Sequence, residues 1–439
     1  MKNIVRLFIV ATVLALSPFA QGLFEEATSG DENASLKYEL NGYARGVMYG
    51  GKVPDKRESD VKSVYGEAAL KVKFKKANFG DAVAEIRFRD GNEFGQGFSE
   101  VNLREAYVNA YLGPLDIRLG KQIVVWGRAD GINPTNNITP QNMIARSPDE
   151  DDRREGNTLL RTWLNFRPLR LEGVFVPVYR ASVLPLHLVK LEDGIVIGDA
   201  VYPKSQIKKS AYALKLNLEM ASFDGSISWF TGYNPLPGFN ALISMIPSFN
   251  VALVPIAYRQ QVYGADFSTT IASLFGLRGE FAFRLPEDNE YKMFVPNSDM
   301  QYVLGLDKDM GNLSILGQYV GRYVFDYELP QVSLNPMVEI ENELIQRNQL
   351  FSGQQDEISH SAFCRIAYKM LHETFVAELP GMYNFTTQES MVRPNVYYDI
   401  TDALRVRAGA ELYFGPKESL YGMIDENLGA GFLELKASF

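Results

Sequence analysis

The sequence contains very little cysteine and histidine: 439 residues include one Cys, Cys364, and three His. A single cysteine excludes an intrachain disulfide framework, a cysteine-rich zinc site and a Cys-x-x-Cys-His haem attachment. We interpret Cys364 as a small strand residue rather than a reactive thiol. An enzyme barrel would need a Ser/His/Asn or Asp/His constellation. Because His187, His360 and His372 are expected at opposite ends of the fold, we predict neither catalysis nor a cofactor.

Long apolar runs and an excess of positive charge are also missing. Beyond the N-terminus, no stretch resembles a bilayer-spanning helix, which needs roughly twenty apolar residues. The chain has 44 Lys plus Arg against 53 Asp plus Glu, a net charge of −9, so a nucleic-acid partner is not expected. Aromatic residues are abundant instead, with 23 Tyr and 27 Phe. Many aromatics without an apolar run are typical of a membrane β-barrel with aromatic girdles and a wet interior.

The N-terminus has the parts of a secretory signal peptide. A basic start and an apolar run of about ten residues precede Ala20–Gly22, which offers a small-x-small cleavage site. We therefore expect a cleaved signal peptide over residues 1–22 and a short, acidic and polar periplasmic segment over residues 23–34. The remaining residues, 35–439, are predicted to form a single barrel domain.

The last strand shows most clearly which fold class to expect. Small or apolar residues fall on every second position from Gly429 to Ala437. Glu434 and Lys436 lie between them, and the chain ends at Phe439. Period-two alternation places one set of side chains on each face of a strand, and it recurs along the chain. This terminal strand resembles the C-terminal signal of Gram-negative outer-membrane β-barrels, in which the final aromatic residue is read by the assembly machinery.

The links between these alternating segments are short and long in turn. Tight turns such as Gly113–Pro114 and Arg167–Pro168 alternate with polar, proline-rich links such as Asp90–Glu100 and Gly127–Gly156. Outer-membrane barrels have short periplasmic turns and longer extracellular loops. We predict an all-β chain: a transmembrane antiparallel up-and-down β-barrel of about eighteen strands, with both termini periplasmic.

Charged side chains occupy positions that the alternation turns toward the lumen. A barrel of about eighteen strands leaves room for an aqueous channel, in which charged groups stay solvated and can set selectivity. The candidate lumen-lining residues are Glu85, Arg87, Arg89, Arg278, Glu280, Arg284, Arg405, Arg407 and Glu411. The mixture of both signs argues against strong charge selectivity, and any polar lumen would need such residues.

One long link differs in composition from the others. After Gly120 the chain passes a glycine-flanked Trp and becomes rich in Asn, Asp, Arg, Gly and Pro. Gly and Asn permit tight backbone turns, while amides and guanidinium groups recognise oxygens. We predict that this loop of about thirty residues folds inward and narrows the bore, with a cap over the mouth as the alternative. The candidate constriction residues are Trp126, Arg128, Asp130, Asn133, Asn136 and Asn137.

This loop and several other segments resemble a known family. Its Gly-Lys-Gln…Trp-Gly…Asn-Pro series is accompanied by Val176–Arg180, Tyr263–Ser268, Leu277–Glu280 and Gly415–Gly422. Together they resemble an uncharacterised family of outer-membrane porin-like proteins, distantly similar to alginate-export and phosphate-selective porins. The resemblance implies a role in passage without naming a cargo. We therefore predict a channel for passive passage of small solutes in the Gram-negative outer membrane. Its expected partners are membrane lipid, the barrel-assembly machinery and the solutes, and a homotrimer stays open.

Two other functions are kept as alternatives. The barrel would serve as a sheath or partner if it enclosed an outer-membrane electron conduit or joined an export complex. It would carry hydrophobic compounds if a segment of the chain filled the bore. The candidate segment is loop 324–358, which contains Leu344, Ile345, Leu350 and Phe351 but also reads as a short amphipathic helix in an extracellular loop.

An acidic run, Asp149–Asp152, is the one place where a metal ion is considered. Carboxylate oxygens are ligands that Ca²⁺ prefers. However, Arg153 and Arg154 follow directly and would neutralise the run. We therefore predict a solvated charged loop and no metal site.

Overall fold

The computed structural model describes residues 36–52, 59–76, 79–186, 195–244, 250–272, 274–287, 294–329 and 333–439. The expected signal peptide and the segment 23–34 lie outside the described residues, as does His187. The strands before the long loop are β1 (Leu36–Lys52), β2 (Ser59–Lys76), β3 (Gly80–Glu93), β4 (Gln96–Leu112) and β5 (Leu115–Gln122). Those after it are β6 (Asn157–Phe166), β7 (Leu169–Val176), β9 (Ala211–Glu219), β10 (Phe223–Tyr233), β13 (Arg259–Ile271), β14 (Phe275–Pro286), β15 (Asp299–Met310), β16 (Leu313–Val324), β17 (Ile358–Met370), β18 (Phe375–Asn384), β19 (Glu389–Val392), β20 (Asn395–Thr401), β21 (Leu404–Phe414) and β22 (Ala430–Ser438).

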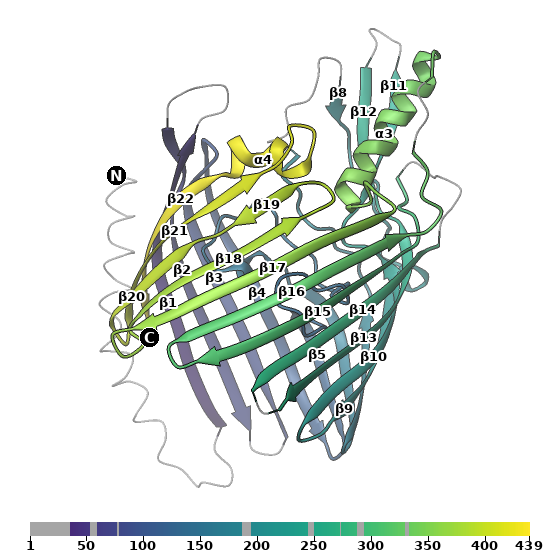
Figure 1. Ribbon diagram of the computed structural model, residues 1–439. Coiled ribbons are helices and arrows are strands. Elements are labelled where there is room, and N and C mark those ends of the chain that lie inside the picture. The colour runs from purple at the N-terminus through teal and green to yellow at the C-terminus, as the bar shows by residue number, and fades with distance from the viewer. Residues whose placement is uncertain are drawn as a thin grey trace.

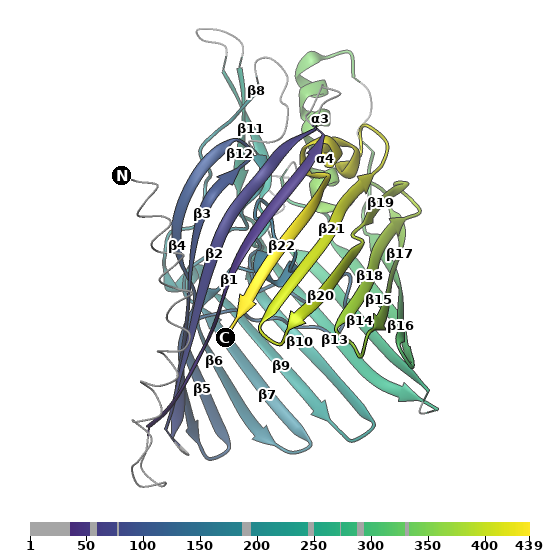
Figure 2. The same cartoon turned by 90° about the vertical axis from the view of Figure 1, so that its left-hand side faces the viewer.

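These strands form one closed antiparallel barrel (Figures 1 and 2). The 19 strand segments make 18 barrel strands, because β19 and β20 both pair with β18 and with β21 and are two halves of one strand. Pro394 lies in the break between the halves, where its missing N–H cannot join the ladder. The predicted fold class and the even strand number are confirmed.

The first and last strands close the barrel. β1 pairs with β22 from Tyr43 opposite Ser438 to Gly50 opposite Gly431. Beyond β22, the Phe439 N–H donates to the Gly42 carbonyl at 3.0 Å, and the Gly42 N–H donates back to the Phe439 carbonyl at 3.0 Å. The terminal aromatic residue is therefore part of the seam. Its reading by the assembly machinery stays a prediction.

The alternation places apolar side chains outside the barrel and polar ones inside. On β22, Leu433 and Leu435 are each 50% exposed, whereas Glu434 between them is 1% exposed and faces the interior. Other strands present the same exposed apolar set, including Ile86, Leu119, Leu214, Leu216, Ile227, Leu304, Leu306 and Ile366. An apolar outer band around a charged interior is the arrangement that a bilayer requires of a barrel. Within the described residues, no helix is long and apolar enough to cross a membrane.

The predicted link Asp90–Glu100 is wrong as a long loop. β3 and β4 continue as a paired hairpin up to Glu93 opposite Gln96, and only a two-residue turn joins them. Gly95 in this turn has φ +80°, a conformation that glycine adopts without strain. The polar residues that suggested a loop are strand residues, and two of them, Glu93 and Glu100, pair with Arg89 on the lumen face.

A small outer sheet and two helices stand at the long-loop end of the barrel (Figure 1). The sheet contains β8 (Ile195–Ile197), β11 (Gly238–Ser244) and β12 (Asn250–Ile256), and the helices are α3 (Pro336–Ser352) and α4 (Leu420–Leu428). The predicted helix in loop 324–358 is confirmed as α3. Its Phe351 ring lies 5.2 Å from the Phe239 ring of β11, so α3 packs against the outer sheet.

Candidate functional site

The loop between β5 and β6, residues 123–156, turns into the barrel and reaches walls on opposite sides. The Trp126 indole Nε1 donates to Glu172 of β7 at 2.9 Å. The Arg128 guanidinium pairs with Asp266 of β13 at 2.7 Å. Farther along the loop, Arg146 pairs with Glu411 of β21 at 2.9 Å. The loop therefore spans the bore, and we call it the lumen loop.

The first part of the lumen loop is held by an apolar core inside the barrel. Its Val124, Trp126 and Ile138 are buried, with at most 4% of each exposed. They pack with inward side chains of the wall, namely Leu159, Val174, Val176, Ala213, Phe230, Val262 and Ala282. Burial of this apolar surface is insensitive to ionic conditions at moderate salt. This half of the loop is thus a fixed lining of the β6–β14 wall.

Glu280 of β14 organises the turn that follows. Its carboxylate accepts the backbone N–H groups of Arg128 and Ala129, each at 3.0 Å. It also accepts the N–H of Thr135 at 2.8 Å and its hydroxyl at 2.9 Å. A carboxylate with this number of donors is a strong anchor, since hydrogen bonds to ionised groups are about twice as strong as neutral ones.

The structure gives the predicted constriction residues different surroundings. Trp126 is 3% exposed and packs into the apolar core, so it supports the loop rather than meeting solute. Asp130 pairs with Arg278 at 2.8 Å. The asparagines shape the turn, with the Asn137 amide donating to the Pro134 carbonyl at 3.1 Å and the Asn136 N–H to the Asn133 carbonyl at 3.3 Å. The loop lies inward as expected, but narrowing of the bore by these particular residues stays a prediction.

Several predicted lumen residues are direct partners of the lumen loop. Arg278 and Glu280 contact its first part, and Arg284 donates to the Pro134 carbonyl at 3.3 Å. Arg87 pairs with Asp152 at 2.7 Å, and Arg407 pairs with Asp149 at 2.6 Å. The other residues of the set pair with wall side chains: Glu85 with Arg87 at 2.8 Å, Arg89 with Glu67 at 3.0 Å, and Arg405 with Asp399 at 2.6 Å.

Glu411 is the most deeply enclosed of these residues. Its side chain has no exposed surface and contacts three guanidinium groups: Arg393 at 2.6 Å, Arg146 at 2.9 Å and Arg153 at 3.1 Å. Arg146 and Arg153 belong to the lumen loop, while Arg393 lies between β19 and β20. One wall carboxylate therefore ties two loop arginines to the β19–β21 side of the barrel.

The ion pairs of the acidic run Asp149–Asp152 differ from those that the sequence predicted. We expected a solvated loop neutralised by the next two residues, but only Asp151 pairs with Arg154, at 2.7 Å. Asp152 instead pairs with Arg45 of β1 at 2.8 Å, and Glu150 pairs with Arg393. The partners come from distant strands that a local sequence pattern does not reveal. Within the described chain, no group of three or more His, Cys, Asp or Glu is arranged to hold a metal ion.

The wall cations perturb the two best-held carboxylates of this run. Burial alone would raise the pKa of Asp149, but Arg407 and Lys436 outweigh burial and hold the pKa below its usual 3.8. For Asp152, burial is likewise outweighed by Arg45 and Arg87, and its pKa lies well below the usual range. Both carboxylates are therefore ionised at neutral and mildly acidic pH.

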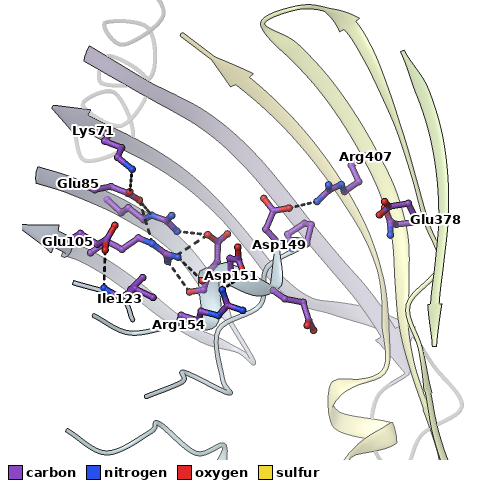
Figure 3. A pocket seen from close by; sticks show the side chains of 15 residues that line it. Lys71, Glu85, Glu105, Ile123, Asp149, Asp151, Arg154, Glu378 and Arg407 are labelled. Atoms are coloured by element: carbon purple, nitrogen blue, oxygen red, sulfur yellow. Dashed lines mark hydrogen bonds and ion pairs between the residues drawn. The ribbon is translucent and has the colours of Figure 1, made fainter. Parts of the chain in front are cut away.

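Two polar cavities border this acidic run (Figure 3 shows the larger). The larger has a volume of about 620 Å³ and includes Lys71, Glu85, Glu105 and Glu378, toward the short turns. The smaller has about 320 Å³ and includes Glu100, Asn102 and Arg180, toward the long loops. Both are lined by the same four residues where they meet: Arg87, Arg104, Asp152 and Arg154. Asp152 of the acidic run thus lies where the two chambers meet, while Asp149, Glu150 and Asp151 line the larger one.

Sequence reasoning missed several residues that line the smaller cavity. Arg45, Glu67 and Arg104 were not among the candidates, although Arg45 has 1% of its side chain exposed and contacts Glu67, Asp152 and Glu434. The signal available was the inward phase of β1, which places Arg45 on the lumen face. The partner across the bore could not be read from that phase.

A closed antiparallel barrel of 18 strands, with a charged interior crossed by one long loop, is the fold of outer-membrane porins. Among solved structures, OccAB3 of Acinetobacter baumannii is similar with a TM-score of 0.55 and 11% identity, over 92% of this chain and 99% of that chain. OccAB4 of the same organism has a TM-score of 0.54 and 10% identity, over 93% and 99%. OccK9 (OpdG) of Pseudomonas aeruginosa is similar with a TM-score of 0.54 and 10% identity, over 92% of this chain and 98% of that chain. At these identities the similarity establishes the fold.

One sequence family also matches part of the chain. Residues 23–149 match the family described as "Protein of unknown function (DUF1302)". The match covers β1 to β5 and the lumen loop as far as Asp149. A search of curated proteins finds no significant match. The resemblance to alginate-export and phosphate-selective porins stays a prediction.

Proposed function

We propose that this protein is an outer-membrane channel for the passive passage of small, hydrophilic solutes. The observation that carries the proposal is the polar interior: a closed barrel contains chambers of about 620 and 320 Å³, lined mainly by ionised side chains. Charged groups in such numbers are stable inside a barrel where water and counter-charges surround them. A bore of this kind suits solutes that keep part of their hydration.

The outer surface supports a membrane location. Exposed aromatic side chains gather near the short turns: Phe74, Phe79, Phe166, Phe223, Phe275, Tyr368, Tyr398 and Phe439. A second group lies toward the long loops: Tyr212, Tyr263, Tyr302, Tyr319, Tyr383 and Phe385. Two aromatic belts that border an apolar band are typical of barrels seated in the outer membrane. We infer that the short turns and both termini face the periplasm, after export through a cleaved signal peptide. Assembly by the barrel-assembly machinery and a homotrimeric state belong to the same proposal.

The lumen loop disfavours the two alternative functions. A sheathed electron carrier would need the bore that this loop spans from β7 and β13 to β21. A plug made from loop 324–358 would need α3 in the lumen, but Leu344 and Leu350 are buried while α3 packs on β11 at the rim (Figure 1). A channel for small solutes, in contrast, is compatible with the lumen loop in its observed position.

Planar bilayers test the proposal directly. The refolded mature protein is expected to give discrete conductance steps that scale with salt concentration, and liposomes containing it should swell in small but not in large sugars. A correctly folded barrel that remains silent in every salt and solute, including the variants described below, would overturn it. Heat-dependent mobility in SDS gels and a β-type circular dichroism spectrum establish that the barrel has folded.

A further inference from the structure

The acidic run of the lumen loop is attached differently from the rest of the loop. Residues 124–138 are held by a dry apolar core and by Glu280, which accepts neutral backbone donors. The run Asp149–Asp152 adds no apolar side chain to that core and contacts the opposite wall through ion pairs. Apolar packing and neutral hydrogen bonds therefore hold residues 124–138 in place, whereas the attachment of the acidic run depends on ion pairs.

The ion pairs of the acidic run converge on wall cations. Asp152 lies 2.8 Å from Arg45 and 2.7 Å from Arg87. Asp149 lies 2.6 Å from Arg407 and 3.5 Å from Lys436. In Figure 3 Asp149 points across the chamber toward Arg407, and both are at the cavity surface. The loop carboxylates thus occupy the places where the wall would hold any other oxyanion.

Water and solute can reach these pairs. Asp149 has 35% of its side chain exposed, and Arg87, Arg104 and Arg407 each line the larger chamber. A cavity of several hundred Å³ accommodates a small organic ion. Guanidinium groups bind carboxylate and phosphate with similar geometry, so a solute oxyanion competes with the loop for the same donors.

We propose that the carboxylates of Asp149 and Asp152 form a displaceable gate and that Arg87, Arg104 and Arg407 form a binding site for solutes that carry carboxylate or phosphate groups. Such a solute replaces the loop carboxylates on these cations, and the displaced run joins the two chambers into one passage. The inference rests on the proposed channel function and names the solute class and the regulation of the same bore. A ligand shifts this equilibrium only through its preference for the open state, which the exposed cations supply.

Proton uptake is not the trigger that these surroundings favour. Five cations face Asp149 and Asp152, namely Arg45, Arg87, Arg104, Arg407 and Lys436, and the Ser147 hydroxyl also donates to Asp152 at 2.6 Å. The repulsion between the two carboxylates, and between Asp149 and Glu434, opposes ionisation, but the cations outweigh it, since the pKa of both aspartates lies below the usual value. Replacement by another anion is the route that keeps every wall cation paired.

The test compares the double variant D149N/D152N with D151N in planar bilayers. The double variant removes the two carboxylates that hold the run to β1, β3 and β21. D151N is the matched control, because Asp151 is 73% exposed on its side chain and its ion pair is with Arg154 of the same segment. We expect the open fraction of D149N/D152N to rise on the order of tenfold, as for ion pairs worth about 1.4 kcal/mol, while D151N stays near wild type.

Anion competition on the wild-type protein provides a second, mutation-free test. Citrate and inorganic pyrophosphate are added separately, against potassium chloride of the same ionic strength. Opening by citrate alone identifies carboxylates, opening by pyrophosphate alone identifies phosphates, and opening by either supports the gate. The double variant should no longer respond.

The outcomes separate the gate from the channel. If wild type and D149N/D152N conduct alike and neither anion changes the conductance, the gate is overturned and the channel stands. If no variant and no anion produces conductance in folded barrels, the channel proposal itself fails. If D149N/D152N does not fold, the wild-type response to citrate and pyrophosphate decides the question.

Discussion

Gly127 lies directly against Glu280: a Cβ atom on this glycine would stand 2.5 Å from both oxygens of the Glu280 carboxylate. It would also stand 2.2 Å from the Asn133 side-chain oxygen, and the backbone at Gly127 has φ +94°. Glycine is therefore required at this position both for space and for conformation. The close approach lets the backbone of the lumen loop wrap around a single wall carboxylate.

The first prediction is that Gly127→Ala loosens the loop while leaving the barrel intact. Strain at a positive φ together with the clash should destabilise the turn by about 1–3 kcal/mol. Hydrogen–deuterium exchange at the amides of Arg128, Ala129 and Thr135 should accelerate, and conductance should become larger and noisier. Gly317→Ala is the control, since a Cβ there meets nothing within 4 Å. Equal exchange in both variants would contradict the role given to Glu280.

The second prediction concerns the enclosed carboxylate of the β21 wall. Glu411→Gln leaves Arg146, Arg153 and Arg393 without their shared anion, and removal of one partner from a buried ionic cluster costs about 3–5 kcal/mol. The temperature at which the folded band disappears from SDS gels should fall, and exchange over residues 146–153 should rise.

A double-mutant cycle separates this electrostatic effect from altered packing. Adding Arg393→Gln to Glu411→Gln removes one uncompensated cation and should restore part of the lost stability. Glu378→Gln serves as the control, because Glu378 pairs with the half-exposed Arg365 at 3.2 Å. A loss in the control as large as in Glu411→Gln would mean that buried charge is not the cause.

The barrel itself was predictable from local pattern. Alternation at Leu433, Glu434 and Leu435 assigns their faces without knowledge of any neighbour, because strand geometry has period two. The order of short and long links then determines which strands pair. The exception, Asp90–Glu100, shows the limit: polar residues at the end of a long paired strand look like a loop.

The lumen loop was predictable only in outline. Its glycines and asparagines indicated an inward fold, but the partners of each side chain depend on which wall faces the loop across a closed bore. Asp152 meets Arg45, 107 positions earlier, whereas its sequence neighbours Arg153 and Arg154 suggested local neutralisation. Local sequence reveals charge and turn preference, whereas the closed barrel determines which charged side chains come into contact.

The third prediction is that acidification does not release the acidic run above the usual pKa of an aspartate. Since the wall cations lower the folded-state pKa of Asp149 and Asp152, their ion pairs contribute stability above pH 3.8 and lose it only as pH falls below that value. Single-channel conductance corrected for electrolyte should be flat from pH 7 to about pH 4. An opening transition centred near pH 6 would show that these aspartates are not held by Arg45, Arg87 and Arg407 in the membrane.

The fourth prediction concerns the seam that closes the barrel. The Phe439 ring lies over Gly42, where a Cβ atom would stand 2.6 Å from Phe439 Cζ, and its backbone exchanges two hydrogen bonds with Gly42. Phe439→Ala keeps those backbone bonds but removes the ring, so it tests the aromatic group alone. Folding into liposomes should slow several-fold when the purified assembly machinery is present and change little without it.

Phe79→Ala is the matched control for the seam. Phe79 is 73% exposed at the same end of the barrel and belongs to the aromatic group near the short turns, but it lies in the β2–β3 turn, away from the β1–β22 pairing. It should lower membrane affinity slightly without affecting assisted folding. Equal slowing of Phe439→Ala with and without the machinery would assign the ring a packing role over Gly42. Equal assisted folding rates for Phe439→Ala and wild type would show that the terminal aromatic ring has no role in the assembly step.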